Sequence, residues 1–268
     1  MLLAGRWYVD AVTLRIGTSG WQYDHWRPGF YPPDVPKARW LEYYANRFET
    51  VESNAAFYRL PERHTFADWA ARTPEGFDMA VKASRYLTHV RRLREPEEAV
   101  RRLVERLEGL GDKVGPILVQ LPPNLRVDCD GLDRTLRSFP SSIRVAVEAR
   151  HPSWFTDDVR RLLERRHGAW CLADNAGKGP PRWRTTDWGY VRLHRGRASP
   201  APCFGRAAIE TWARRIAEIW GSDPDVYCYC NNDERVCAVR DAHRLALAAA
   251  RVGIRPTRTP ESREVTVG

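Results

Sequence analysis

Short apolar runs alternate with amphipathic segments along this chain, a pattern that predicts strands followed by helices. The predicted strands span residues 14–18, 49–54, 78–83, 116–121, 144–149, 169–174, 189–194 and 226–230. Residues with helical spacing lie at 37–48, 63–71, 95–110, 132–139, 154–166, 206–220 and 235–252, and the proline-rich segment after the sixth strand shows little helix. Eight such units without a long linker predict one α/β domain, a (β/α)8 TIM barrel over residues 14–253. A doubly wound sheet is the alternative.

The two ends of the chain fall outside this repeat. Residues 1–13 are interpreted as a short N-terminal extension, and residues 254–268 as an irregular C-terminal tail. The first twelve residues lack the apolar core and cleavage site of a signal peptide, and no run of 18 apolar residues occurs. We therefore expect a cytoplasmic location and no membrane contact.

Composition limits the classes of partner. At 268 residues and 43% hydrophobic, the chain can bury one large core. Its formal charge of +9 favours anionic partners, including phosphorylated sugars and nucleic acid. Only four of the 43 basic residues are lysines, however, and an arginine bias of this kind can come from codon usage. The six cysteines form no Cys-x-x-Cys and are interpreted as small core residues instead of a disulfide framework or a zinc site.

The fifth predicted strand carries the first sign of chemistry. Strand alternation places Val145, Val147 and Ala149 on one face and Glu148 and Arg150 on the other. A charged pair at the carboxyl end of a buried strand, just before a turn into a helix, is where α/β enzymes place reactive groups. An ion pair that only closes the barrel end is the structural alternative.

The other strands end in the same way, which strengthens the functional interpretation. The polar residues that share a face and close the strands are Glu52, Asn54, Lys82, Ser84, Gln120, Glu148, Arg150, Asp174, Arg192, His194 and Asn231. In a barrel these side chains converge on the carboxyl-terminal mouth, where barrel enzymes have their active sites. Because a buried charge is costly unless it is paired, we expect this ring to form a site.

Several segments together resemble the YecE-like family, known as domain of unknown function 72. They are residues 16–21, 51–54, 119–122, 147–151 and 190–194, with Phe57-Tyr58, Trp154 and Asn231-Asn232-Asp233, in family order from about residue 14 to 252. The resemblance implies a barrel related to sugar isomerases, without a settled activity. The chain departs from the family pattern at Arg195, inserted between His194 and Gly196, at Cys230 and at Asp241.

Three uses of the ring remain open. In the first, Glu52, Glu148, Asp174 and His194 hold one or two divalent metals. In the second no metal is needed: Glu148 or Asp174 acts as base, Lys82 as acid, electrophile or nucleophile, and Arg150 and Arg192 clamp an anion. In the third the barrel only binds its ligand. The chain has no Gly-x-Gly-x-x-Gly after a strand and no Walker loop, so we expect no nucleotide cofactor.

Aromatic residues after the first two strands suggest a sugar-like or base-like ligand. Trp21, Tyr23 and Tyr58 fall near the predicted mouth, where their rings can stack on a ligand or pack loops on the rim. The sequence therefore predicts an enzyme for a sugar-phosphate-like or nucleic-acid-derived anion, acting by hydrolysis or isomerisation, with Glu148, Asp174, Lys82 and Glu52 as its reactive groups. The predicted binding residues are Arg150, Arg192, His194, Gln120, Asn54, Asn231 and the three aromatics. A metal-dependent phosphodiesterase that binds DNA and a non-catalytic anion-binding protein are the alternatives.

Overall fold

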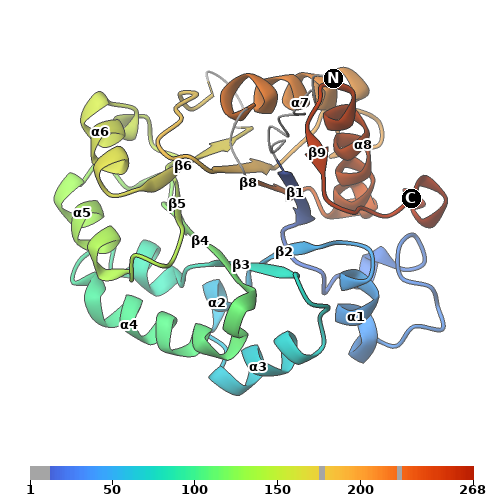
Figure 1. Ribbon diagram of the computed structural model, residues 1–268, viewed down its shortest axis with the longest axis horizontal. Helices are drawn as coiled ribbons and strands as arrows, with labels where there is room; N and C mark the ends of the chain where they lie inside the picture. Colours follow the sequence, from blue (N-terminus) through green and yellow to red (C-terminus); the bar gives the residue numbers. More distant parts are fainter. Residues whose placement is uncertain (1–12, 175–178, 222–224) are drawn as a thin grey trace, which may run out of the picture.

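The central feature of the computed structural model, which describes residues 13–174, 179–221 and 225–268, is a curled parallel sheet. Its strands are β1 (Thr13–Thr18), β2 (Thr50–Ser53), β3 (Asp78–Lys82), β4 (Val114–Gln120), β5 (Val145–Glu148), β6 (Gly168–Ala173), β7 (Gly189–Leu193), β8 (Asp225–Cys230) and β9 (Arg255–Pro256). They pair in the order β2-β3-β4-β5-β6-β7-β8-β1-β9. Figure 1 shows the strands in the middle and the helices around them. The eight predicted strands are all present.

The barrel closes between β1 and β2 by a narrow seam. A single parallel bridge joins Ser19 to Glu52 there. The Tyr44 hydroxyl accepts a hydrogen bond from the Thr18 amide at 3.0 Å and lies 3.1 Å from the Thr50 carbonyl oxygen. Gly17 allows the close approach, because a Cβ on it would lie 2.4 Å from that same Thr50 oxygen. The seam therefore depends on one tyrosine and one glycine in place of a full ladder.

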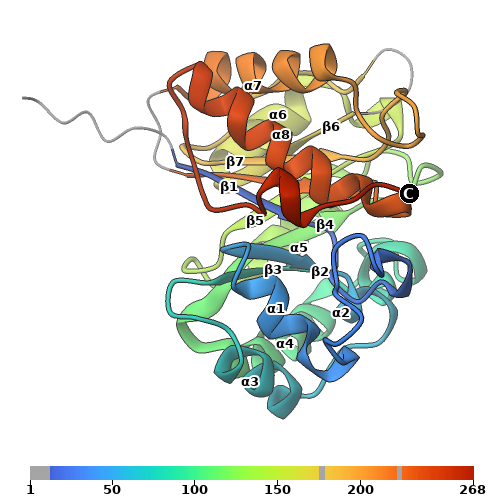
Figure 2. The same ribbon diagram turned by 90° about the vertical axis from the view of Figure 1, so that its right-hand side faces the viewer.

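The helices follow the predicted amphipathic segments. They are α1 (Trp40–Ala45), α2 (Ala55–Tyr58), α3 (Arg63–Ala71), α4 (Pro96–Leu107), α5 (Cys129–Ser138), α6 (Asp157–Arg165), α7 (Arg206–Trp220) and α8 (Cys237–Arg251). Thr156 caps α6 by accepting from the Val159 amide, and Asp128 caps α5 by accepting from the Gly131 amide. The helices surround the sheet in both views (Figures 1 and 2). No helix within the described ranges is long and apolar enough to cross a membrane.

The inside of the barrel is layered along its axis. Its middle holds small and aromatic side chains: Ala80, Leu118, Ala146, Ala169, Cys171, Trp188, Tyr190, Tyr227 and Tyr229. At the amino-terminal end of the strands, Arg15 pairs with Asp78 at 2.9 Å and with Asp225 at 3.2 Å. Arg144 joins the same Asp225 at 3.0 Å. This group of two arginines and two aspartates, the amino-end network, closes the barrel opposite the predicted mouth.

The two ends of the chain compare differently with the expectations. The tail from 254 to 268 is not irregular throughout, because β9 pairs with β1 and a short 3-10 helix spans Ser262–Glu264. The Thr266 amide donates to the Gly29 carbonyl at 2.8 Å, so the tail packs against the loop after β1. The extension 1–13 lies outside the described residues except for Thr13, which begins β1.

The cysteines also differ in part from the expectation. Cys203, after β7, and Cys237, the first residue of α8, form a disulfide with their Cα atoms 4.8 Å apart. Cys171, Cys228 and Cys230 are buried small residues in strands, as predicted. The pairing joins the loop after β7 to the start of α8 across 34 residues of sequence, which spacing alone does not reveal.

Candidate functional site

A fully buried ion network lies at the carboxyl end of the strands. Arg192, on β7, donates from Nη2 to Glu52 Oε1 at 2.8 Å and from Nη1 to Glu148 Oε2 at 2.6 Å. The three side chains are at most 1% exposed. Tyr190 donates its hydroxyl to the second oxygen of Glu52 at 2.7 Å. The planar fork of one arginine thus holds two carboxylates from strands on different sides of the barrel.

The network fixes the charge state of its members. Burial alone would raise the pKa of Glu148, but Arg192, His194 and Arg150 together hold that pKa well below its ordinary value. Burial opposes the charge on Arg192, yet Glu52 and Glu148 raise its pKa well above the ordinary value. Glu148 is therefore ionised, and its role in the network is to bind the two arginines Arg192 and Arg150. A carboxylate with so low a pKa is a weak base at neutral pH, which disfavours the predicted role of Glu148 as general base.

The remaining oxygen of Glu148 faces two more site residues. Arg150 donates to it from Nε at 2.9 Å, and His194 Nε2 lies 3.4 Å away. The Asn231 side-chain nitrogen lies 2.9 Å from His194 Nδ1, so Asn231 holds the imidazole ring with its Nε2 toward the carboxylate. Arg150 is 34% exposed, so this edge of the network reaches solvent.

Asp174 is oriented differently from the other acidic residues. Its carboxylate accepts the backbone amides of His194 and Arg195, the latter at 3.0 Å. Burial raises the pKa of Asp174, and these two amide hydrogen bonds oppose the rise. The side chain therefore fastens the start of the loop after β7, and none of its hydrogen bonds reaches Glu52 or Glu148.

The predicted metal ligands do not assemble. No group of three or more His, Cys, Asp or Glu side chains suited to a metal occurs within 13–174, 179–221 and 225–268. The physical reason is that Arg192 already occupies Glu52 and Glu148, while backbone amides occupy Asp174.

Lys82 has no ionic partner among the residues that the structure describes. It is the last residue of β3, and alternation with buried Ala80 turns its side chain inward. Its ammonium lies 3.9 Å from the centre of the Phe57 ring. Across the described part of the chain, no carboxylate oxygen lies within 4.0 Å of it. Burial, and after it the charge of Arg192, lowers the pKa of Lys82 to about 8.

Unpaired polar atoms lie on the β1 and β2 side of the mouth. Ser19 Oγ and Asn54 Oδ1 are buried and have no hydrogen-bond partner in the described chain. The two residues touch, because Asn54 Nδ2 donates to the Ser19 carbonyl at 3.2 Å. Buried polar atoms normally have a hydrogen-bond partner. Two neighbouring oxygens at the mouth that lack one therefore indicate a place for a ligand hydroxyl. Gln120 differs, because it is buried and donates to its neighbour Leu121 at 3.1 Å.

The aromatic residues divide into packing and rim positions. Trp21 is buried against Trp69 in an edge contact at 5.2 Å, which agrees with the alternative that such rings pack loops on the rim. Tyr23 donates its hydroxyl to the Ser19 carbonyl at 2.5 Å and packs on Trp26, which makes it a support of the loop. Tyr58 is 76% exposed beside Phe57 and can still meet a ligand.

Sequence reasoning omitted three residues from the site. Tyr190 shares a face with Arg192 and His194 at spacings of two, so the alternation that found those residues could have found it. Phe57 was noted only as a nearby aromatic, although its ring lies against Lys82. Ser19 follows β1 and carried no signal, because a serine after a strand is common in turns.

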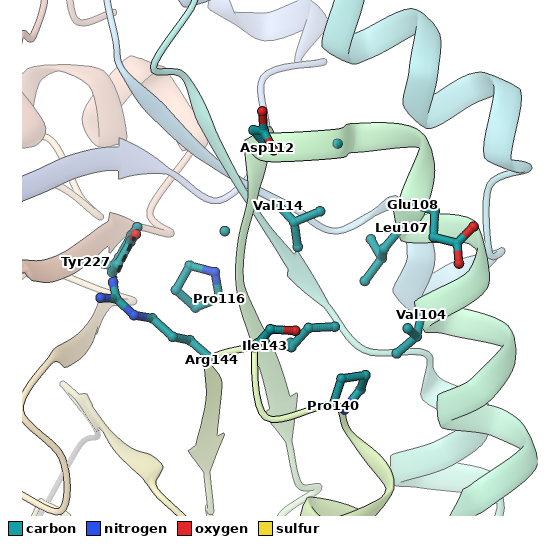
Figure 3. Close-up of a pocket in the computed structure, with 13 residues that line it drawn as sticks. Val104, Leu107, Glu108, Asp112, Val114, Pro116, Pro140, Ile143, Arg144 and Tyr227 are labelled. Carbon is teal, nitrogen blue, oxygen red and sulfur yellow. Dashed lines mark hydrogen bonds between the residues drawn. The ribbon is translucent and has the colours of Figure 1, made fainter.

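A cavity of about 560 Å³ lies at the other end of the barrel. Figure 3 shows it between α4 and the starts of β4 and β5, with Arg144 and Tyr227 on the barrel side. Its apolar lining comes from Val104, Leu107, Val114, Pro116, Pro140 and Ile143, and Glu108 and Asp112 line it as well. Arg144, the cation in this lining, is already paired with Asp225. The groups suited to chemistry lie at the carboxyl end instead.

These features define an α/β barrel of the TIM type with a charged carboxyl-terminal mouth. The chain belongs to the family described as "Protein of unknown function DUF72", whose model matches residues 15–264. The resemblance to YecE-like proteins is thereby confirmed.

Individual relatives agree with this assignment. The UPF0759 protein YecE of Escherichia coli (strain K12) is 29% identical over 144 residues, which are 53% of this chain. The match spans 50% of the length of that relative. The UPF0759 protein YunF of Bacillus subtilis (strain 168) is 25% identical over 255 residues, 82% of this chain and 89% of YunF.

Solved structures of other proteins have the same overall fold. A DUF72 family protein from Thermotoga maritima MSB8 superposes with a TM-score of 0.78 at 24% identity, covering 88% of this chain and 98% of that one. A D-psicose 3-epimerase superposes with a TM-score of 0.53 at 12% identity, covering 90% and 99%. The barrel prediction is confirmed, and these likenesses concern the fold alone.

Proposed function

We propose that this protein is an enzyme that isomerises a small anionic, hydroxyl-bearing substrate of the sugar-phosphate type at the carboxyl mouth of its barrel. The observation that carries the proposal is the unbalanced charge of the mouth. Among the described residues, the ion pairs of Arg150 and Arg192 use only the carboxylates of Glu52 and Glu148, which also act on the unpaired Lys82. An anionic ligand group would supply the missing negative charge.

Arg150 is the group best placed to bind that anion. Only its Nε is hydrogen-bonded to the protein in the described chain, which leaves the terminal nitrogens for a ligand. Guanidinium groups bind phosphate and carboxylate in a bidentate manner. Ser19 and Asn54, with their unpaired oxygens, suit the hydroxyl groups of the same ligand.

Isomerisation is preferred to hydrolysis because of the proton chemistry in the mouth. Glu148 is held ionised, so it cannot serve as the acid that a leaving group needs. Lys82, with a pKa of about 8, can release and accept a proton near neutral pH. A group that both takes and returns a proton is what isomerisation of a hydroxy-carbonyl compound requires.

The proposal is tested by following a panel of aldose and ketose phosphates, beside the uncharged sugars, by proton NMR. We expect conversion of at least one phosphorylated member and a KM raised about 10- to 100-fold in Arg150→Gln. Arg144→Gln is the matched control, because Arg144 precedes β5 as Arg150 follows it and is similarly exposed, at 40%. No conversion in the panel, or equal effects of the two variants, would contradict the proposal. Cleavage of abasic DNA would favour the phosphodiesterase alternative over the isomerase. Ligand binding without turnover would favour the non-catalytic anion-binding protein.

A further inference from the structure

The lysines of this chain differ sharply in their surroundings. Lys37 is exposed and forms an ion pair with Asp24. Lys113 donates to the Ala70 carbonyl at 2.6 Å and to Thr73 Oγ1 at 3.2 Å. Lys82 has neither kind of partner in the described residues, and its Nζ rests on the face of Phe57. Of the lysines that the structure describes, Lys82 therefore has the amine that is least bound to the protein.

The acidic residues near Lys82 are occupied by other donors. Glu52 accepts from Arg192 and Tyr190, and Glu148 accepts from Arg192 and Arg150. They still act on Lys82 electrostatically, since both raise its pKa against the larger lowering by burial and Arg192. The amine thus has negative charge nearby, but it makes no direct hydrogen bond to a carboxylate that would keep it protonated.

A neutral amine beside fixed carboxylates is suited to covalent chemistry with a carbonyl group. The uncharged form attacks a carbonyl carbon, and the imine that results is protonated and positively charged. Glu52 and Glu148 favour positive charge at this position, so they would stabilise the protonated imine. The Phe57 ring covers one side of the nitrogen and would shield the imine from water.

We propose that Lys82 forms an imine with the carbonyl carbon of an anionic hydroxy-aldehyde or hydroxy-ketone bound at the mouth. The inference rests on the proposed function, because it assumes that the mouth binds such a substrate, and it deepens that function by naming the covalent step. In it the amine nitrogen bonds to the carbonyl carbon, two amine hydrogens leave with the carbonyl oxygen as water, and hydrolysis restores the lysine. No oxidant or reductant takes part.

The imine explains how the mouth could move a proton of the substrate. The protonated imine withdraws electrons from the adjacent carbon, so the hydrogen of that carbon becomes acidic and passes as a proton to water at the mouth, which leaves an enamine. Return of a proton to that same carbon, from the same or the opposite face, restores the imine, and its hydrolysis gives back the substrate or its epimer at that carbon. Arg150 would hold the anionic end of the substrate, while Ser19 and Asn54 accept its hydroxyls.

The chain makes the test unusually clean, because it contains only the four lysines 37, 82, 113 and 178. The full-length protein is incubated with D-glyceraldehyde 3-phosphate and sodium cyanoborohydride, which reduces an imine to a stable amine. Peptide mass spectrometry then measures the adduct at each lysine. We expect at least about tenfold more adduct at Lys82 than at exposed Lys37. Inorganic phosphate should compete, and uncharged glyceraldehyde should label Lys82 less.

Two variants complete the experiment. Lys82→Met should lose the dominant adduct, whereas Lys37→Met should keep it. Labelling of Lys82 that is no greater than that of Lys37 would overturn the imine, even if the protein isomerises a sugar phosphate. An adduct confined to Lys82 without turnover of any sugar phosphate would support the imine and overturn the proposed isomerase. The two failures are thus distinguishable.

Discussion

The two ends of β5 carry arginines with opposite tasks. Arg144, before the strand, reaches Asp225, which also pairs with Arg15, and Arg15 reaches Asp78. There two arginines meet two aspartates, so the charges balance. Arg150, after the strand, reaches Glu148 in a group where cations outnumber carboxylates and polar atoms remain unpaired. Both ends of the barrel carry ion pairs. Only at the carboxyl end do the named cations outnumber the carboxylates they share, so an anionic ligand could supply the missing negative charge there.

The comparison teaches that charge at a barrel end is not itself a sign of chemistry. The amino-end network is partly exposed, with side chains 19% to 40% accessible, and such pairs contribute little to stability. The carboxyl network is buried, where each unpaired charge is costly. A buried ion network, edged by cations that have no carboxylate of their own among the described residues, is therefore the feature that distinguishes a functional end from a structural one.

The largest expected effect concerns Lys82. In Lys82→Met we expect turnover of the substrate to fall about 100- to 10,000-fold, the usual contribution of a proton-transferring or nucleophilic group. Asp78→Asn at the other end should leave turnover within about twofold of wild type. Steady-state kinetics of both variants checks this. Retention of full activity by Lys82→Met would place the chemistry elsewhere.

Removal of Lys82 should not weaken the fold. Because burial lowers its pKa from 10.5 to about 8, the charged amine opposes folding below pH 8, and this effect fades as pH rises toward 10.5. Urea titrations of Lys82→Met should therefore show equal or greater stability at pH 7, with no gain near pH 10.5. A fall in stability at pH 7 would show that Lys82 has a structural role.

The second effect concerns the arginine between the two glutamates. Arg192→Met leaves Glu52 and Glu148 buried without a cation between them, and we expect the free energy of unfolding to fall by about 3–5 kcal/mol. Arg144→Met removes an exposed partner of Asp225, which keeps Arg15, and should cost at most about 1 kcal/mol. Denaturant titrations compare them. Equal losses would remove the distinction between the ends.

The third effect is a pH dependence of stability. The pKa of Glu148 in the folded protein lies well below its ordinary value of 4.5. Its ionised form therefore stabilises the fold above pH 4.5, and this contribution disappears as pH falls through the lowered pKa. Glu148→Gln should cost about 2–3 kcal/mol at pH 7 and progressively less toward pH 3. A difference that stays constant with pH would contradict the charged network.

The smallest effect is expected at the amino end. Burial raises the pKa of Asp78, and Arg15 only partly offsets that rise. Because ionised Asp78 is not favoured by folding, Asp78→Asn should change the free energy of unfolding at pH 7 by less than about 1 kcal/mol. A loss comparable to that of Arg192→Met would show that both ends depend equally on their charges.

Much of this arrangement was predictable from residue patterns. β7 was expected at 189–194 and is found at Gly189–Leu193, because alternation of buried and polar side chains marks a strand closely. The same alternation set Glu148 and Arg192 at the mouth. It could not show that Arg192 links Glu148 to Glu52, since the reach of a long side chain across the barrel depends on how the sheet curls.

Other features needed the folded chain. Trp21 follows β1 as a rim residue would, but contact with Trp69 of α3 buries it. Asp174 directly follows β6, as the other mouth residues follow or close their strands. Its carboxylate nevertheless accepts backbone amides, because the loop after β7 passes beside it. The amine of Lys82 could be placed in the mouth from alternation, whereas its lack of an ionic partner depends on which carboxylates Arg192 and Arg150 occupy.

The measurement that tests the central claim most directly is the pKa of the Lys82 amine. Lysine labelled with carbon-13 at the ε position gives one resonance for each lysine, and Lys82→Met assigns the resonance of interest. A titration midpoint near 8 is the result this account requires. A midpoint at the ordinary value of 10.5 would mean that Lys82 is an ordinary solvated cation and would contradict the account of the mouth as its reactive site.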